Sequence, residues 1–488
     1  MPYILALDEG TTSARAALYD EQGRRIAMES NPITCIYPQP GWVEQDANEI
    51  WQSQLDAAWR TLASARVTPA EVAAIGITNQ RETTVVWDRA TGEPVAPAIV
   101  WQCRRTADFC NSLAASSDGA AVTQKTGLVV DAYFSASKIR WILENVPGVR
   151  SRDLMFGNID AWLIWKLTGG KSHVTDPSNA SRTMLMNLAS GDWDPELMAL
   201  FGVPRTMLPD IVPSSSVVGA TTAESLGAEI PIAGIAGDQQ AALAGQACFR
   251  AGLSKNTYGT GCFALMHTGV HRPVSKNRLL ATRAASHNAD AQFAVEGSIF
   301  IAGAAVQWLR DELGLIGTAA ESEGVAASVS SAGGVYVVPA FVGLGAPHWD
   351  SAARGLITGI TRATGRAEIV RATLESIAYQ TRELVEAMEA DSGERLTELR
   401  VDGGATANNF LMQFQADILD RPIVRPADVE TTALGAAYLA GLATGVWQNV
   451  EELEQFWRAD RTFTPRLNAD ERESLYAGWK RAVARCRA

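Results

Sequence analysis

Short apolar runs that end in glycine or aspartate, each followed by a stretch with helical spacing, recur along the chain. After the Gly-Gly turn at 403–404, apolar residues repeat three and four positions apart, which predicts a helix over about 410–419. Strands that alternate with helices are typical of an α/β protein. The segments that show the pattern are AAIGITNQRE (73–82), IPIAGIAGDQQAALAGQ (230–246), GGVYVVPAF (333–341) and LRVDGGATANNFLMQFQADIL (399–419).

Two distant segments share a pattern of their own. Residues 6–24 (ALDEGTTSARAALYDEQGR) and 256–272 (NTYGTGCFALMHTGVHR) each contain a Gly-Thr turn, then a strand of similar length and a second turn that ends in arginine. Such a repeat predicts two related domains whose hairpins face each other across a cleft, although Gly-Thr turns are common enough to coincide by chance. At 488 residues the chain is too long to fold around a single hydrophobic core, and we expect domains at 1–247 and 248–488.

Composition narrows the possible partners. The chain is 47% hydrophobic and 20% charged, and its formal net charge of −12 argues against a nucleic-acid partner or an anionic membrane surface. The N-terminus MPYILALDEG lacks the pattern of a signal peptide, and no apolar run approaches the roughly 20 residues of a membrane-spanning helix. We therefore expect a cytoplasmic protein that acts on small molecules and has no stable insertion in a membrane.

The spacing of the cysteines and histidines argues against a disulfide-bonded protein and against a zinc protein. The six cysteines contain no C-x-x-C pair, and the five histidines contain no H-E-x-x-H pattern. This spacing fits neither a disulfide framework nor a zinc site, so most of the cysteines are expected to be small buried apolar residues.

The familiar nucleotide-binding motifs are also absent. WKLTGGKS (165–172) has Trp165 where a P-loop requires its first glycine, and GLGAPH (343–348) has His348 in place of the last glycine of G-x-G-x-x-G. The chain contains neither the H-R-D nor the D-F-G motif of protein kinases. ATP would have to be held by another arrangement.

The two Gly-Thr hairpins offer such an arrangement. Glycine lets the backbone approach a phosphate, amides of the turn point inward as a nest, and threonine hydroxyls add donors. Arg15 could reach a terminal phosphate, and Asp8 suits Mg²⁺ bound through water. A plain β-hairpin with ordinary turn residues is the alternative for either segment taken alone.

Eight segments together resemble the FGGY carbohydrate kinases. The resemblance covers nearly the whole chain and implies two actin-like, ribonuclease-H-like α/β domains with a cleft between them. NQRET and WQCRRT are the motifs that indicate glycerol as the acceptor within this family. The segments are DEGTTSAR (8–15), ITNQRETTVVW (77–87), WQCRRT (101–106), YFSASKIRWILEN (133–145), GIAGDQQAAL (234–243), NTYGTGCF (256–263), GLITGITRATGRAEIVRATLES (355–376) and RVDGGATANNFLMQFQADIL (400–419).

Phosphoryl transfer needs a base for the acceptor hydroxyl, and Asp238 is the candidate. It follows a strand-like run at the start of a predicted helix, where ligands of α/β sheets bind. From the residues alone, Asp238 could equally be a helix N-cap, and the adjacent Arg81 and Glu82 could be a solvated surface pair. The resemblance favours the base role for Asp238, and it implies glycerol binding by Arg81, Glu82, Tyr133, Asp238 and Gln239, beside an apolar wall of Trp101 and Phe263.

The resemblance also assigns the nucleotide side, with ATP and Mg²⁺ as cofactors. It implies phosphate contacts from Thr11, Thr12, Ser13, Arg15 and Thr260, and nucleoside contacts from Gly303, Gln307, Gly404 and Asn408. Metal binding is expected at Asp8 and Asp238. The residues themselves support Gly404, because a glycine that opens a helix after a strand lets a base or ribose lie against the backbone.

Two features depart from the family pattern. Glu9 stands where the family usually has glutamine or an aliphatic residue, and strand alternation predicts that it points away from Asp8. Segment 221–232 has neither the arginine of a sugar-bisphosphate loop nor a histidine that a phosphotransfer protein could modify. Neither mode of regulation is carried over to this chain, for which we expect a homodimer or homotetramer.

The leading interpretation is ATP-dependent phosphorylation of glycerol to sn-glycerol 3-phosphate, a step of glycerol catabolism, with Asp238 as general base. A kinase of the same family that acts on a pentulose, gluconate or erythritol is the nearest alternative. An actin-like or chaperone-like ATPase without a phosphate acceptor is the alternative from another class.

Overall fold

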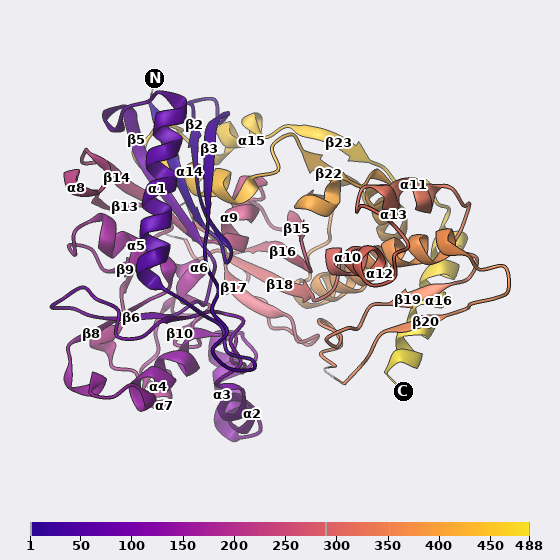
Figure 1. The fold of residues 1–488 in the computed structure, drawn as a ribbon, viewed down its shortest axis with the longest axis horizontal. Coiled ribbons are helices and arrows are strands. Elements are labelled where there is room, and N and C mark those ends of the chain that lie inside the picture. Colours follow the sequence, from indigo (N-terminus) through magenta and orange to yellow (C-terminus); the bar gives the residue numbers. More distant parts are fainter. Residues whose placement is uncertain (1, 288–289, 351, 488) are drawn as a thin grey trace.

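Two mixed β-sheets form the frame of the molecule, one in each half of the chain (Figure 1). The computed structural model describes residues 2–287, 290–350 and 352–487. The first sheet has the order β13 (Ser215–Ala220), β14 (Pro231–Gly237), β5 (Val72–Asn79), β1 (Tyr3–Glu9), β2 (Ser13–Tyr19), β3 (Arg25–Pro32). The second has the order β17 (Leu280–Arg283), β18 (Phe293–Ile299), β16 (Cys262–Gly269), β15 (Ser254–Tyr258), β21 (Leu399–Asp402), β22 (Ile423–Pro426), β23 (Ala459–Phe463).

The two sheets repeat one plan of strand pairing. In the first, β1 pairs antiparallel with β2 and parallel with β5, and β2 continues antiparallel to β3. In the second, β15 pairs antiparallel with β16 and parallel with β21, and β16 continues antiparallel to β18. The α/β fold class is confirmed, and the Gly-Thr segments that suggested a repeat are the equivalent β1–β2 and β15–β16 hairpins.

Helices cover both faces of each sheet because alternate residues of the central strands are apolar on both sides. In the first sheet, Leu5 and Leu7 belong to a core with α1 (Ala47–Ala65) and α5 (Ile159–Leu167), whereas Ile4 and Ala6 pack with α14 (Thr431–Thr444). In the second, α12 (Arg366–Ser392) and α13 (Asn409–Leu419) share one core with β15, β16 and β21. α9 (Asp238–Gly245) contacts β15 and β16.

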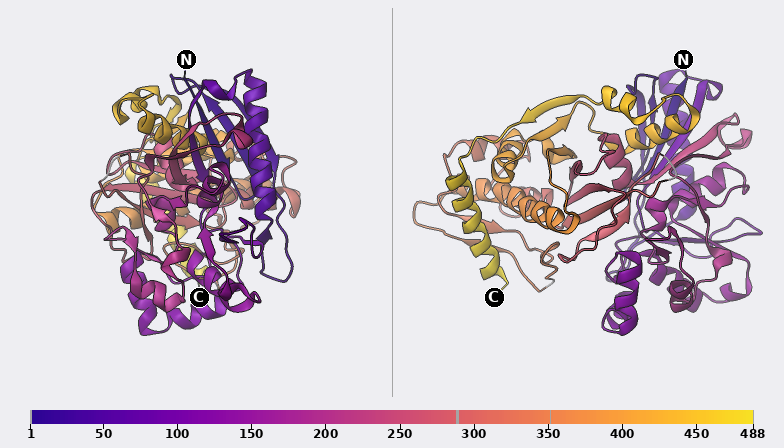
Figure 2. Two further views of the ribbon diagram at one scale, coloured as in Figure 1. Left: turned by 90° about the vertical axis from the view of Figure 1, so that its left-hand side faces the viewer. Right: turned by 180° about the vertical axis from the view of Figure 1, so that it is seen from behind.

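The halves meet where α9 crosses α14. A Cβ on Gly435 would lie 1.8 Å from the Ala241 carbonyl oxygen, and one on Gly245 would lie 1.9 Å from that of Thr431. Only glycine permits so close an approach of two backbones. Although α14 comes late in the chain, it packs against β1, β5 and β14 of the first sheet (Figure 2). The division at residues 247 and 248 stays a prediction.

A separate core lies below the first sheet. It contains residues of α2 (Ala107–Ala114), α3 (Ser117–Thr126), α4 (Ser135–Asn145) and α7 (Pro195–Phe201), with the pair β6 (Val85–Asp88) and β8 (Leu154–Gly157). Leu280, Ala281 and Phe293 of the second sheet also pack into this core. Strands β17 and β18 are therefore anchored to the first half of the chain.

The remaining elements are short or peripheral. Their helices are α6 (Pro177–Ala180), α8 (Ala223–Leu226), α10 (Gly303–Asp311), α11 (Glu321–Ala327), α15 (Val450–Phe456) and α16 (Ala469–Cys486). Their strands are β4 (Glu44–Gln45), β7 (Ala98–Ile99), β9 (Val174–Thr175), β10 (Met186–Asn187), β11 (Asp192–Trp193), β12 (Asp210–Ile211), β19 (Tyr336–Val338) and β20 (Leu356–Thr358). Of the helices in the described ranges, none has the length and apolarity to cross a bilayer, and all six cysteines are free thiols.

Candidate active site

The first hairpin places a carboxylate beside a cation. Asp8 and Arg15 are register partners in β1 and β2, and an Arg15 Nη2 to Asp8 Oδ2 distance of 2.8 Å makes them an ion pair. The Arg15 Nη1 also lies 3.0 Å from Oε2 of Glu430, which precedes α14. Thr11, Thr12 and Ser13 form the turn, where the Gly10 N–H donates to the Ser13 carbonyl at 2.9 Å. The turn carries exposed and half-buried hydroxyls next to a charged cluster.

The surroundings of the Asp8 carboxylate favour the binding of a further cation beside it. Burial, reinforced by the negative charges of Asp238 and Glu430 and opposed by Arg15, raises the pKa of Asp8 to about 6. Within the described ranges, no group of three or more metal-ligating side chains comes together. Mg²⁺ commonly uses only one or two carboxylates together with water and substrate phosphates, so the Asp8 and Asp238 pair fits this ion.

Glu9 differs from Asp8 in its surroundings. It follows the alternation of Leu5 and Leu7, so its side chain lies on the α1 side of the sheet, in agreement with the prediction that it points away from Asp8. The side chain is 0% exposed, and among the described residues neither carboxylate oxygen has a hydrogen-bond partner. Burial, followed by the charge of Asp8, raises the pKa of Glu9 well above its usual value.

The second hairpin opens into a pocket of about 430 Å³. The five residues predicted for the nucleotide in the second half, Thr260, Gly303, Gln307, Gly404 and Asn408, all line it. Asn408 caps α13 by accepting a hydrogen bond from the Leu411 N–H at 2.9 Å, and its amide donates to Ser322 at 3.1 Å. Gly404 opens a 3-10 turn (Gly404–Ala407), and α13 begins at Asn409. The expectation that Gly404 opens the helix itself is therefore wrong by five residues, whereas the helix predicted over about 410–419 is confirmed.

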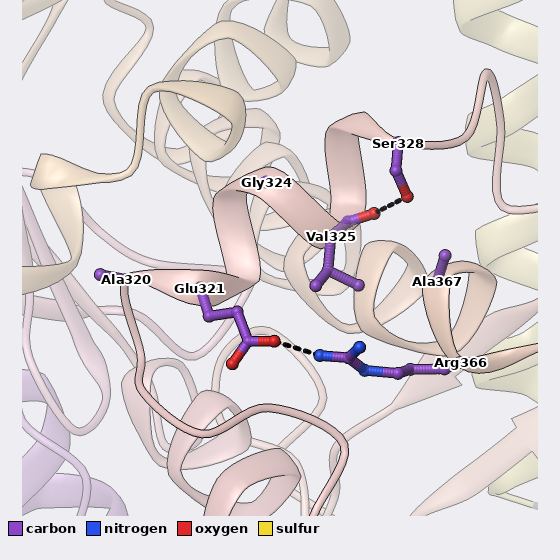
Figure 3. Close-up of a pocket in the computed structure, with 7 residues that line it drawn as sticks. All are labelled: Ala320, Glu321, Gly324, Val325, Ser328, Arg366 and Ala367. Carbon is purple, nitrogen blue, oxygen red and sulfur yellow. Dashed lines mark hydrogen bonds and ion pairs between the residues drawn. The ribbon is translucent and has the colours of Figure 1, made fainter.

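A second pocket lies on the face of α11 that points away from the pocket of the second hairpin (Figure 3). It is lined by Glu321, Gly324, Val325 and Ser328, whose spacing places them on one side of the helix. Glu321 forms an ion pair there with Arg366 at the start of α12. This contact ties α11 to α12, while Ser322 and Glu323 on the other side of α11 line the pocket of the second hairpin.

The residues predicted for the acceptor form a buried ionic cluster. Arg81, just past the end of β5, lies with its Nε 3.1 Å from Oδ1 of Asp238, the first residue of α9. Arg81 and Glu82 have side chains that are 2% and 1% exposed, whereas the Asp238 side chain is 33% exposed. The pair is therefore not a solvated surface pair, and Asp238 is the accessible member. Gly237, not Asp238, is the N-cap of α9.

The backbone at Glu82 is held in an unusual conformation. Its φ of 61° lies in the left-handed region that non-glycine residues seldom adopt. The Glu82 carbonyl accepts hydrogen bonds from Thr84 at 3.1 Å and from Ser135 and Lys138 at 3.3 Å each. These donors fix the turn that directs the Glu82 carboxylate into the cluster.

Aromatic residues border the cluster on one side. The Trp101 and Tyr133 rings meet edge to face with centroids 5.4 Å apart. The Trp101 indole N–H donates to the Thr11 hydroxyl at 2.9 Å, which joins this wall to the first hairpin. On the side of the second sheet, Lys255 Nζ donates to the Phe263 carbonyl at 3.3 Å and also to the Gln239 side chain. The predicted acceptor and phosphate residues are thus connected by direct contacts.

Besides Lys138, four charged residues of this region were not predicted. Glu430 pairs with Arg15, Lys255 bonds Gln239, and both Arg182 and Glu296 contact the Arg81–Glu82 pair. Glu296 lies in the otherwise apolar or small-residue strand FAVEGSI (293–299), and a lone carboxylate in such a run is a signal that could have indicated it. Arg182 follows the short α6 in SNASRTM (178–184), where the local pattern carries no comparable signal.

Comparisons with known proteins account for this arrangement. Profiles of the FGGY family of carbohydrate kinases match the chain over residues 3–245 with the N-terminal domain and over 254–444 with the C-terminal domain. The chain belongs to the FGGY family of carbohydrate kinases. It is 62% identical to the glycerol kinase of Symbiobacterium thermophilum, over 99% of this chain and 98% of that protein. It is 58% identical to glycerol kinase 2 of Thermotoga maritima, over 99% of each.

A solved structure of an FGGY kinase agrees with the fold. The crystal structure of Plasmodium falciparum glycerol kinase with ADP matches with a TM-score of 0.95 and 37% identity, over 100% of this chain and 98% of that one. A xylulose kinase from Lactobacillus acidophilus matches with a TM-score of 0.89 at 23% identity, which supports the fold alone. The family resemblance and the two-domain fold predicted from the sequence are confirmed.

Proposed function

We propose that this FGGY kinase transfers the γ-phosphoryl group of ATP to glycerol and releases ADP and sn-glycerol 3-phosphate. The observation that carries the proposal is the buried Arg81–Glu82–Asp238 cluster, in which Asp238 alone is accessible. A small polyol needs donors and acceptors for its hydroxyls and an apolar wall for its carbons. The cluster beside Trp101 and Tyr133 offers both, and relatives of 58–62% identity carry the name glycerol kinase.

In this mechanism Arg81 and Glu82 orient the acceptor by hydrogen bonds, with Tyr133 and Gln239 beside them and Trp101 and Phe263 against its carbons. Asp238 takes the proton of the attacking hydroxyl as the bond from that oxygen to the γ-phosphorus forms. The bond between the γ-phosphorus and the β–γ bridging oxygen breaks, and the electron pair leaves with ADP. Arg81 holds the Asp238 carboxylate in place through the contact of 3.1 Å.

The nucleotide would lie between the hairpins. Thr11, Thr12, Ser13 and Arg15 would bind phosphates from the first, with Thr260 from the second. Gly303, Gln307, Gly404 and Asn408 would border the nucleoside in the pocket of about 430 Å³. Asp8 and Asp238 would hold Mg²⁺ through water. When bound, this ion neutralises charge that develops on the phosphates.

Acceptor specificity tests the proposal directly. ADP release is measured with purified protein, ATP and Mg²⁺ against glycerol, dihydroxyacetone, xylulose and gluconate in turn. We expect glycerol to give the highest kcat/KM, because a site with buried hydrogen-bonding groups rejects a substrate that leaves them unpaired. Turnover that no polyol stimulates would point to an ATPase, and a preference for xylulose or gluconate would point to another FGGY kinase.

A further inference from the structure

A carboxylate from the second sheet reaches into the proposed acceptor site of the first half. Glu296 lies in β18, and its side chain is 0% exposed. Its Oε2 lies 2.6 Å from Arg81 Nη1 and its Oε1 lies 2.9 Å from Arg81 Nη2. Two parallel bonds of this kind fix both the position and the plane of a guanidinium group.

The same carboxylate reaches Glu82 through one intermediary. Arg182 Nη1 lies 3.4 Å from Glu296 Oε2, and Nη2 lies 3.3 Å from Oε1. The Arg182 Nε donates to Glu82 Oε1 at 2.5 Å. Glu296 therefore contacts Arg81 directly and Glu82 through Arg182.

The charges explain why this position needs an ionised carboxylate. Arg81 and Arg182 are both buried and repel each other. Burial and the charge of Arg81 work against the charged form of Arg182, but Glu296 and Glu82 outweigh them, and the pKa of Arg182 is raised above its usual value. Although burial opposes ionisation of Glu296, Arg182 and Arg81 lower its pKa to about 2. Without this negative charge, two buried guanidinium groups would share Glu82 and the more exposed Asp238, and their positions would shift.

We propose that Glu296 is a positioning residue that sets Arg81 and Glu82 for the acceptor from the second half of the molecule, an inference that rests on the proposed function. Because β18 lies beside β16, which carries Phe263, one edge of the second sheet supplies both the apolar wall and this carboxylate. Binding of the acceptor and seating of β18 against the first half then favour each other.

The test compares Glu296→Gln with wild type. We expect the glycerol Kd and KM to rise at least tenfold, while the ADP Kd stays within twofold because the nucleotide pocket is separate. Glycerol should slow hydrogen exchange of residues 293–299 in wild type and not in the variant. Glu375→Gln is the matched control: Glu375 is also buried and pairs with an arginine, Arg371 at 2.7 Å, but it lies in α12. It should leave both affinities unchanged.

Other results of this experiment would contradict either the inference or the proposed function. A folded Glu296→Gln protein with a glycerol Kd within twofold of wild type overturns the inference, and so does an equal loss of glycerol and ADP affinity, which would indicate a merely structural role. If Glu296→Gln does not fold, Glu296→Asp decides, since it keeps the charge but is one methylene shorter and does not reach both arginines from β18; we expect a three- to tenfold loss of glycerol affinity, and no loss overturns the inference. Wild type that is not stimulated by glycerol contradicts the proposed function instead.

Discussion

The hairpins β1–β2 and β15–β16 share one backbone plan and differ in chemistry. Asp8 faces Arg15 in the first, and at the equivalent register position Thr257 faces Phe263 in the second. Next along each strand, Glu9 corresponds to Tyr258, and both are fully buried. The first hairpin thus presents charge to the cleft, whereas the second presents an uncharged turn that leads into the pocket of about 430 Å³.

This difference separates two tasks within one repeated fold. The charged groups for which we propose contacts with phosphates and protons collect in the first half, where Asp8, Arg15, Arg81 and Asp238 are linked by ion pairs or by the influence of their charges. In the proposed function, the second half would provide backbone, hydroxyl and apolar surface for the nucleoside. It reaches the charged groups through Glu296, Lys255 and Glu430. Variants of the charged groups that face the cleft in the first half should therefore change kcat, and variants that line the pocket of the second half should change nucleotide affinity.

Asp238→Asn gives the largest expected effect. We expect kcat for glycerol phosphorylation to fall by about 10²–10⁴, because the amide cannot take the hydroxyl proton. The ADP Kd, measured by calorimetry, should stay within a few-fold of wild type. Asp311→Asn, which alters a surface carboxylate paired with Arg310, should keep full activity. Retention of wild-type kcat by Asp238→Asn would refute the base assignment.

Gly404→Val tests the other half. A Cβ on Gly404 meets nothing within 4 Å, so valine projects into the pocket without disturbing the fold. We expect the ADP Kd and the KM for ATP to rise at least tenfold, with glycerol affinity and Tm nearly unchanged. The adjacent Gly403→Ala is the contrast: Gly403 has a φ of 89°, and a Cβ there would lie 2.5 Å from the Tyr258 carbonyl oxygen. It should lower Tm, and equal effects of the two variants on Tm would contradict the pocket geometry.

Asp8 should make Mg²⁺ use depend on pH. Its pKa of about 6 means that protons compete with the ion below pH 6. The Mg²⁺ concentration for half-maximal activity should then rise by up to about tenfold per pH unit as the pH falls. Asp8→Asn should need more Mg²⁺ at pH 8 and lose this dependence. Thr257→Val, at the equivalent position of the second hairpin, should keep it; a wild-type profile in Asp8→Asn would exclude Asp8 from the metal site.

How much of this comparison the sequence could predict depends on the range of the interactions. Turn glycines and strand alternation are local patterns, and they were sufficient for the hairpins. The position of Asp238 at a strand end made it a candidate base but left a helix N-cap equally open, and only the family resemblance favoured the base. Contacts between distant segments were not predictable in this way: Glu430 lies 415 residues from Arg15, and Glu296 lies 215 residues from Arg81. Such pairs depend on how the two sheets pack, which the local pattern does not encode.

Glu9→Gln tests the face of the first hairpin that lies away from the cleft. We expect kcat to stay within twofold of wild type, because Glu9 lies on the α1 side of the sheet. Stability should rise, since burial raises the pKa of Glu9 above its unfolded value of about 4.5 and the native state binds a proton that the unfolded state releases. Wild-type stability then falls as pH rises above this unfolded value, and glutamine removes that slope. The gain in Tm should be larger at pH 8 than at pH 5, by about 2–4 °C for each kcal/mol.

Tyr258→Phe is the matched variant in the second hairpin. The Tyr258 hydroxyl donates to Gln415 at 2.8 Å, so its loss should cost about 0.5–1.5 kcal/mol. Because burial raises the pKa of this phenol, it is neutral at both pH values and the loss should not change between pH 5 and pH 8. The changes in stability caused by the two variants should have opposite signs for one reason: the second hairpin buries a hydroxyl with a hydrogen-bond partner, whereas the first buries a carboxyl without one. A Glu9→Gln protein that is less stable than wild type at pH 8 would show that the carboxyl has a role that this comparison misses.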